Sequence, residues 1–174
     1  DLTGLSATAT STDPVEGLSA SSAPDIFNII VDAVADAPSI TATGGTLDEG
    51  NPIPVTISGS LGADTDGSET ITGYQVSGVP AGFTFNQGTN LGGGVWAFTV
   101  AQVAGLTIVS ANPAFAGSLN LTATVLTTEN PVSDGEFDFT DNNNSASTSF
   151  SVTWEDDDEP LVAPPAPLCV DETN

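Results

Sequence analysis

The stretch Ser118-Leu-Asn-Leu-Thr-Ala-Thr-Val-Leu-Thr127 alternates apolar with polar residues. Because successive side chains of a β-strand point to opposite faces, this pattern predicts a strand with one face in a hydrophobic core. The stretch from Ser147 to Trp154 alternates in the same way. The residues that the two patterns place in the core are Leu119, Leu121, Ala123, Val125, Phe150, Val152 and Trp154.

Strand-forming residues dominate the rest of the chain as well. Thr, Val, Ile, Ala and Ser are common, 18 Gly and 12 Pro interrupt them, and no apolar period of 3.6 residues is present. Ala101 to Gly105 is the single stretch that predicts a helical turn. Further strands are expected at Ser39 to Thr43, Ile53 to Ser58, Thr70 to Val76, Phe83 to Phe85 and Val95 to Val100. Ile57, Tyr74, Trp96 and Phe98 are expected to join the core. About seven short strands separated by turns predict an antiparallel β-sandwich.

The chain also repeats itself. Leu5-Ser-Ala-Thr8 matches Leu121-Thr-Ala-Thr124, an offset of 121 − 5 = 116, and Pro38 matches Pro160, an offset of 160 − 38 = 122. A repeat of about 120 residues exceeds the roughly 20 to 50 residues of solenoid repeats and predicts self-contained domains in an array. The predicted parts are residues 1–37, the last strands of a preceding repeat or strands donated to a neighbouring subunit; 38–155, a complete repeat; and 156–174, a junction with the first strand of the next repeat.

The first part predicts a hairpin with an apolar face that includes Phe27, Ile29 and Val31. A two-stranded hairpin is marginally stable alone, so we expect it to complete another domain. If separate subunits complete one another in this way, the product is an open filament.

The composition excludes several chemistries. The chain has no Lys, Arg or His and 23 Asp and Glu residues, for a formal charge of −23. Nucleic-acid binding depends on Lys and Arg, and a Ser-His-Asp triad needs His. A solvated acidic surface, or adaptation to high salt, is one explanation of this charge. The acids are clustered, however, and none lies between Ile71 and Thr128. Clusters of hard oxygen ligands favour bound calcium.

Three segments carry these clusters. Asp64-Thr-Asp66-Gly-Ser-Glu69 has carboxylates on nearby residues around a glycine, as calcium loops do. Asp32 and Asp36 precede Pro38, and Asp156, Asp157 and Asp158 stand in the corresponding place before Pro160. Asp48 and Glu49 follow the first predicted strand of the repeat. If the loop with Asp64 and Asp66 lies at the same end as Asp48 and Glu49, these two segments and the one with Asp32 and Asp36 place carboxylates around one junction. Each motif alone also fits a solvated turn.

The motifs together resemble a known family. Val-Ala-Asp36-Ala-Pro38, Asp48-Glu49-Gly, Asp64-Thr-Asp66-Gly-Ser-Glu69-Thr-Ile, Val79-Pro80-Ala-Gly82, Gly92-Gly-Gly94-Val-Trp96 and Gly105-Leu106-Thr-Ile follow one another in this order. This succession resembles the tandem cadherin-like or immunoglobulin-like repeats of giant bacterial surface adhesins, which are calcium-dependent, type I secreted and associated with biofilms. The resemblance implies an immunoglobulin/cadherin-like β-sandwich, an extracellular, cell-surface location and calcium that stiffens the junctions between repeats.

By position, the resemblance implies that Asp36, Glu49, Asp64 and Asp66 are ligands at the near junction. Asp156, Asp157 and Asp158 with Glu172 would be the ligands at the far one. The expected partners are therefore calcium and adjacent identical repeats or subunits, with no nucleic acid. No apolar run approaches the roughly 18 residues of a membrane span.

Two other functions remain open at this point. A calcium-dependent carbohydrate-binding β-sandwich would need exposed aromatic rings, which Tyr74, Trp96 and Trp154 would have to supply. A glycoside hydrolase would need two acids beside such rings. We expect the acids to lie in loops at the ends of the sandwich, and therefore expect no enzymatic activity.

Overall fold

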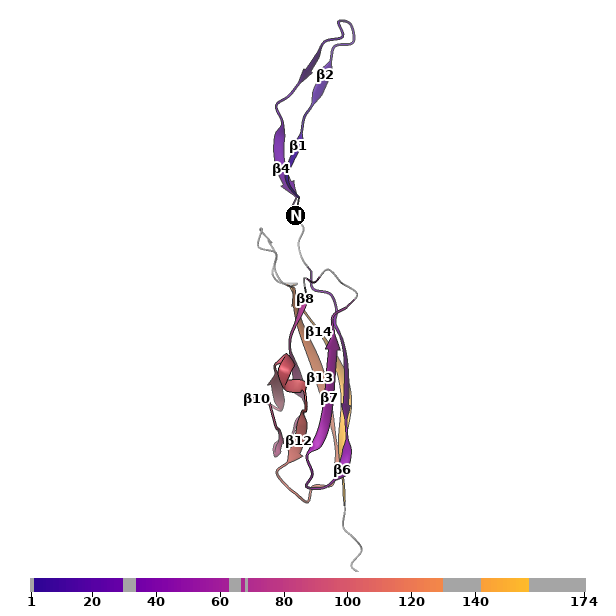
Figure 1. Cartoon of the computed structure of the whole chain (residues 1–174), viewed down its shortest axis with the longest axis vertical. Helices are drawn as coiled ribbons and strands as arrows, with labels where there is room; N and C mark the ends of the chain where they lie inside the picture. The colour runs from indigo at the N-terminus through magenta and orange to yellow at the C-terminus, as the bar shows by residue number, and fades with distance from the viewer. Residues whose placement is uncertain (1, 30–33, 63–66, 68, 130–141, 157–174) are drawn as a thin grey trace, which may run out of the picture.

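A computed structural model describes residues 2–29, 34–62, 67, 69–129 and 142–156 (Figure 1). This described part of the chain is all-β with several antiparallel sheets. The first four strands are β1 (Leu2–Ala7), β2 (Thr10–Thr12), β3 (Ser19–Ser21) and β4 (Asp25–Ile29). The others are β5 (Ser39–Gly44), β6 (Thr46–Asp48), β7 (Ile53–Ser60), β8 (Glu69–Ser77), β9 (Phe83–Phe85), β10 (Thr89–Gly92), β11 (Val95–Phe98), β12 (Thr107–Ser110), β13 (Gly117–Glu129) and β14 (Asn143–Glu155).

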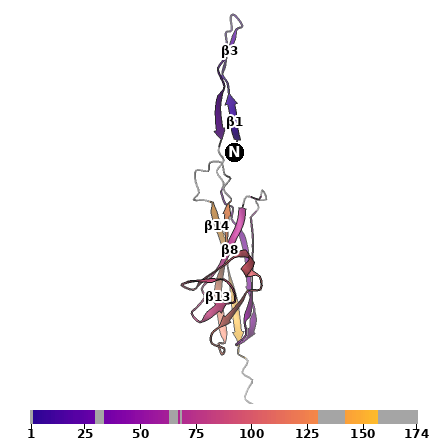
Figure 2. The same ribbon diagram turned by 60° about the vertical axis from the view of Figure 1, so that its left-hand side comes forward.

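Two sheets share a hydrophobic core. One has the strand order β10-β11-β8-β13-β14-β6, and the other has the order β5-β7-β12-β9. Their neighbouring strands are antiparallel, except that β6 runs parallel to β14. The core contains residues from both sheets, including Ile53 and Ile108 from one and Val76 and Val152 from the other, all completely buried. We call this unit, residues 38–155 as far as they are described, the two-sheet body (Figures 1 and 2).

The stretch that predicted the fold forms the longest strand pair of the two-sheet body. β13 and β14 pair continuously from Gly117 opposite Trp154 to Thr128 opposite Asn143. The core residues expected from alternation are buried, except Leu119, which is partly buried against the core. The expected companions Ile57, Tyr74, Trp96 and Phe98 are buried too.

Every strand expected within residues 38–155 is present, and three short ones were missed there. The missed strands are β6, β10 and β12. The strand expected within residues 156–174 and Val31 of the expected hairpin face lie outside the described residues. The expected helical turn is a 3₁₀ turn from Val100 to Val103. No helix in the described ranges is long and apolar enough to cross a lipid bilayer.

The chain changes sheets at Gly44 and Gly45 without reversing direction. β5 belongs to the four-stranded sheet, and β6 continues past this point into the six-stranded sheet beside β14. The backbone N–H of Thr153 donates to the carbonyl of Gly45 at 3.1 Å. A Cβ on Gly44 would lie 2.2 Å from the carbonyl oxygen of Ser151, so only glycine permits this close approach. Residues 46–49 are therefore carried to the end of the body where β14 stops.

Residues 2–29 form a separate two-stranded ribbon, the hairpin (Figure 2). β1 pairs with β4, β2 pairs with β3, and the turn between them is closed by hydrogen bonds of Asp13 with Gly17 and Leu18. Apolar side chains of the hairpin are exposed, including Phe27 at 46%, Ile29 at 46% and Leu2 at 56%.

Candidate cation site

A row of three polar residues closes one end of the core. Glu69, the first residue of β8, is the register partner of Glu129, the last residue of β13. The backbone N–H of Glu129 donates to the carbonyl of Asn142 at 2.8 Å, which continues the register of β13 and β14 by one residue. The three residues therefore occupy one row across three neighbouring strands. Each is only 5% exposed. We call Glu69, Glu129 and Asn142 the end row.

The end row faces the core because of the strand period. Along β13, the buried positions are Leu121, Ala123, Val125, Thr127 and Glu129, so Glu129 continues the apolar face by one more step. Residues directly opposite one another in adjacent strands have side chains on the same face. The sequence thus places a polar group where the same alternation would otherwise place a fifth core residue.

The segment before β5 covers this end. The backbone N–H of Asp36 donates a hydrogen bond to Oε1 of Glu69. The side-chain amide of Asn144 donates to the carbonyl of Ala35 at 2.9 Å. Ala35 is 5% exposed, whereas Asp36 is exposed. These contacts hold the residues that precede the body against the ends of β8 and β14.

The electrostatics of the end row are unusual. Opposed residues in antiparallel strands have Cβ atoms about 4.5–5.5 Å apart, and like charges there are destabilising. Two carboxylates about 5 Å apart repel by about 3 kcal/mol at an effective dielectric near 20. The chain has no Lys, Arg or His to offset this repulsion. In addition, Oδ1 of Asn142 is buried and makes no hydrogen bond. A buried carbonyl oxygen without a donor costs about 1–3 kcal/mol, and a cation would satisfy it.

Three of the predicted acids, Asp48, Glu49 and Asp156, lie at the opposite end of the body. Glu155 is the register partner of Asp48, and the backbone N–H of Glu49 donates to the carbonyl of Glu155 at 2.8 Å. Asp156 follows directly and is exposed. Asp48 and Glu49 therefore do not meet Asp36 and Glu69, contrary to the expectation of one junction, while Asp64 and Asp66 lie outside the described residues. Asp48 and Glu49 lie at the far end because β6 continues in the direction of β5.

Only part of the predicted ligand set can be placed. Asp32, Asp64, Asp66, Asp157, Asp158 and Glu172 lie outside the described residues. Within the described ranges, no group of three or more His, Cys, Asp and Glu side chains is close enough to hold a metal ion. The structure does bring Glu69, a predicted ligand, beside Glu129. Glu129 was not singled out from the sequence. The signal for Glu129 was present, because the alternation of β13 extends to it.

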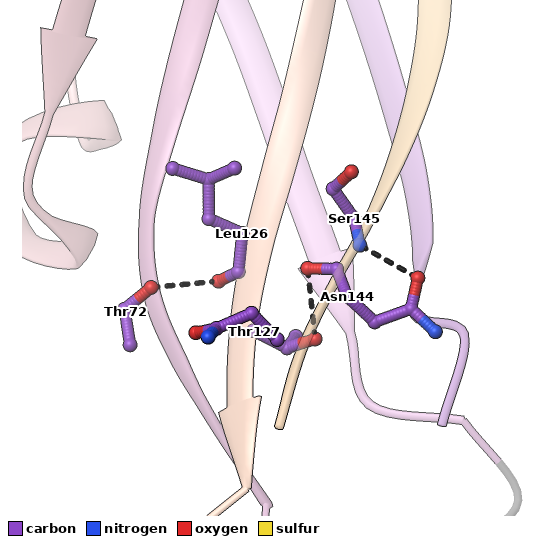
Figure 3. A pocket seen from close by; sticks show the side chains of 6 residues that line it. Thr72, Leu126, Thr127, Asn144 and Ser145 are labelled. Carbon is purple, nitrogen blue, oxygen red and sulfur yellow. Dashed lines mark hydrogen bonds between the residues drawn. The ribbon is translucent and has the colours of Figure 1, made fainter. Parts of the chain in front are cut away.

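A pocket of about 320 Å³ lies beside this end, lined by residues of β8, β13 and β14 (Figure 3). The hydroxyl of Thr72 donates to the carbonyl of Leu126, and the hydroxyl of Thr127 donates to the carbonyl of Asn144, both at 3.2 Å. The backbone N–H of Ser145 donates to Oδ1 of Asn144 at 2.8 Å. The described side chains that line this pocket, including Asn143, carry no carboxylate, imidazole or amine.

The aromatic rings named for sugar binding are packing residues. Tyr74 is 4% exposed, Trp96 is 8% exposed and Trp154 is 1% exposed. The hydroxyl of Tyr74 accepts a hydrogen bond from the backbone N–H of Gly59, and the indole N–H of Trp154 donates to the carbonyl of Asn51. Their faces are therefore not available as a stacking platform for a sugar.

Comparison with models of known protein families gives no match, and neither does comparison with curated proteins.

Proposed function

We propose that the chain is a structural calcium-binding module of an extracellular, cell-surface adhesin stalk or filament, with an immunoglobulin/cadherin-like β-sandwich as its repeating unit. One observation carries the proposal: two opposed carboxylates and an amide oxygen are buried in one row of a chain without a cationic side chain. Calcium prefers six to eight oxygen ligands and accepts both carboxylate and amide oxygens.

The end row supplies a partial ligand set on this proposal. Two carboxylates that bind through both oxygens and one amide oxygen provide five ligands, to which water or other oxygens would add. Asp64 and Asp66 precede Glu69 by a few residues in the sequence and remain proposed ligands. Asp48, Glu49, Glu155 and Asp156 lie at the opposite end, where a following repeat would begin.

The mechanism would be electrostatic. Without calcium, the carboxylates at the ends of adjacent modules repel one another, and with calcium that repulsion is cancelled. Free calcium at 100 times its dissociation constant stabilises the binding state by about 2.7 kcal/mol, which is enough to favour one arrangement of a junction. Attachment or biofilm formation would then follow from a stiff stalk.

Isothermal titration calorimetry of the full chain with calcium tests the binding. We expect saturable binding that weakens at least about tenfold in Glu129→Gln, because one charged ligand is lost. Glu16→Gln is the matched control, since Glu16 is exposed in the hairpin turn. Equal affinities of the two variants would contradict the end-row assignment. Absence of a calcium heat in the original chain would contradict it as well.

Small-angle scattering of a chain with two modules in tandem tests the mechanical role. We expect the maximum dimension to fall when calcium is chelated, because the junction loosens. An unchanged dimension, together with normal calcium binding, would separate the cation site from any role in stiffness.

A further inference from the structure

The hairpin reproduces the register of the closing strand pair of the two-sheet body. Leu5 is paired with Phe27, as Leu121 is paired with Phe150. The next pairs also correspond: Ser6 with Ile26 matches Thr122 with Ser149, and Ala7 with Asp25 matches Ala123 with Thr148. The offsets are 121 − 5 = 116 for the first strand and 150 − 27 = 123 for the second. The connection between the strands differs by 123 − 116 = 7 residues, while these three pairs are unchanged. A register shift between Leu2 and Leu5 then places Leu2 opposite Ile29, as Leu119 is opposite Val152.

The matching positions differ in burial. In the body, Leu121 is 1% exposed, Phe150 is 8% exposed and Val152 is completely buried. In the hairpin, the counterparts of Phe150 and Val152 are Phe27 and Ile29, and both are 46% exposed. The hairpin thus has the core face of β13 and β14 without the rest of the core.

The body shows what covers such a face. β5 packs against both β13 and β14, and β7 packs against β14. β8 pairs with β13 along the edge of β13 that faces away from β14. All three covering strands lie within residues 38–116. A two-stranded hairpin is marginally stable in water by itself, so its apolar face needs a cover of this kind.

We infer that the hairpin is the closing strand pair of a second two-sheet body, and that its apolar face binds a segment of the same type as residues 38–116. This face consists of Leu2, Leu5, Phe27 and Ile29. The segment would supply the counterparts of β5 and β7 on the face and of β8 along the edge of β1. The inference rests on pairing and burial, and not on the proposed calcium binding.

The opposite faces of β4 provide a matched pair of substitutions. Ile29 lies on the apolar face with Phe27, whereas Ile26 lies on the other face, in the position of exposed Ser149. Ile29→Asp and Ile26→Asp introduce the same charge in place of the same side chain. Only the first change would place a charge in the second core.

The test adds a copy of residues 38–117 directly before residue 1 of the full chain. Because Leu2, opposite Ile29, takes the place of Leu119, opposite Val152, residue 1 corresponds to position 118, from 119 − 1, and the added segment joins at its natural spacing. Hydrogen exchange then reports the backbone amides of residues 2–7 and 25–29. We expect them to exchange at least about 100-fold more slowly than in the chain without the addition. Calorimetry should show a second unfolding transition.

Ile29→Asp should abolish this protection and the second transition, while Ile26→Asp should keep both. The original body remains in every variant, so its own transition and its buried Trp154 show that the molecule is folded. Unprotected hairpin amides in the extended chain, or equal effects of the two substitutions, would overturn the inference. Sedimentation of the original chain provides a further check. If it were a dimer that Ile29→Asp dissociates, a second hairpin would be the partner.

Discussion

The repulsion within the end row can be measured by a double-mutant cycle. The cycle compares the original chain with Glu69→Gln, Glu129→Gln and the double variant, at neutral pH in the presence of a chelator. The two residues are directly opposed across β8 and β13. If the carboxylates keep the spacing of about 5 Å that opposed residues have between their Cβ atoms, they should repel by about 3 kcal/mol at an effective dielectric near 20. Each single variant should therefore be more stable than the original chain, and the second substitution should add little.

The assay is urea unfolding followed by the fluorescence of the two buried tryptophans, Trp96 and Trp154, with thermal unfolding as a second measure. For a domain of this size, 3 kcal/mol corresponds to a rise in Tm of about 10 °C. Calcium should reverse this order of stability and make the original chain more stable than the variants, because the original chain gains the binding energy that the variants lose. A coupling energy near zero in chelator, or an unchanged order with calcium, would refute the electrostatic reasoning.

Two further predictions concern the packing of the body. Trp154→Phe removes the 2.9 Å hydrogen bond to the carbonyl of Asn51 and leaves a void, so the free energy of unfolding in urea should fall by about 2–3 kcal/mol; an unchanged value would mean that this contact contributes nothing. Gly44→Ala places a methyl group 2.2 Å from the carbonyl oxygen of Ser151, so the free energy of unfolding should fall by about 3 kcal/mol and Tm should fall with it. Thr43→Ala, at the exposed neighbouring position, should change Tm little. Similar Tm values for these two variants would contradict the close approach of the sheets.

The core could be read from the sequence because its signal is local. Alternation over ten residues places Leu121, Ala123 and Val125 on one face, and the structure buries all three. β12 was missed because it has only four residues, Thr107–Ser110. Its place beside β7 and β9 depends on pairing with distant residues, which a local pattern does not contain.

The candidate site was harder to predict from the sequence than the core, because its composition depends on which end of the body each strand reaches. The motif with Glu69 was recognised, but its partner Glu129 lies 60 residues away in the sequence, from 129 − 69 = 60. The placement of Asp48 depended on whether the chain turned back after β5. It continues because two small residues, Gly44 and Gly45, let the backbone pass from one sheet to the other close to β14.

The parallel pairing of β6 with β14 has a mechanical consequence. A stretching force applied between Ser39 and Glu155 would pull β6 and β14 in opposite directions along their axes. Three register pairs, from Thr46 opposite Thr153 to Asp48 opposite Glu155, would then be loaded together in shear. Shear forces such bonds to rupture at once, whereas peeling breaks them one after another. The change of sheets after β5, which places β6 beside β14, therefore raises the force needed to unfold the body by stretching.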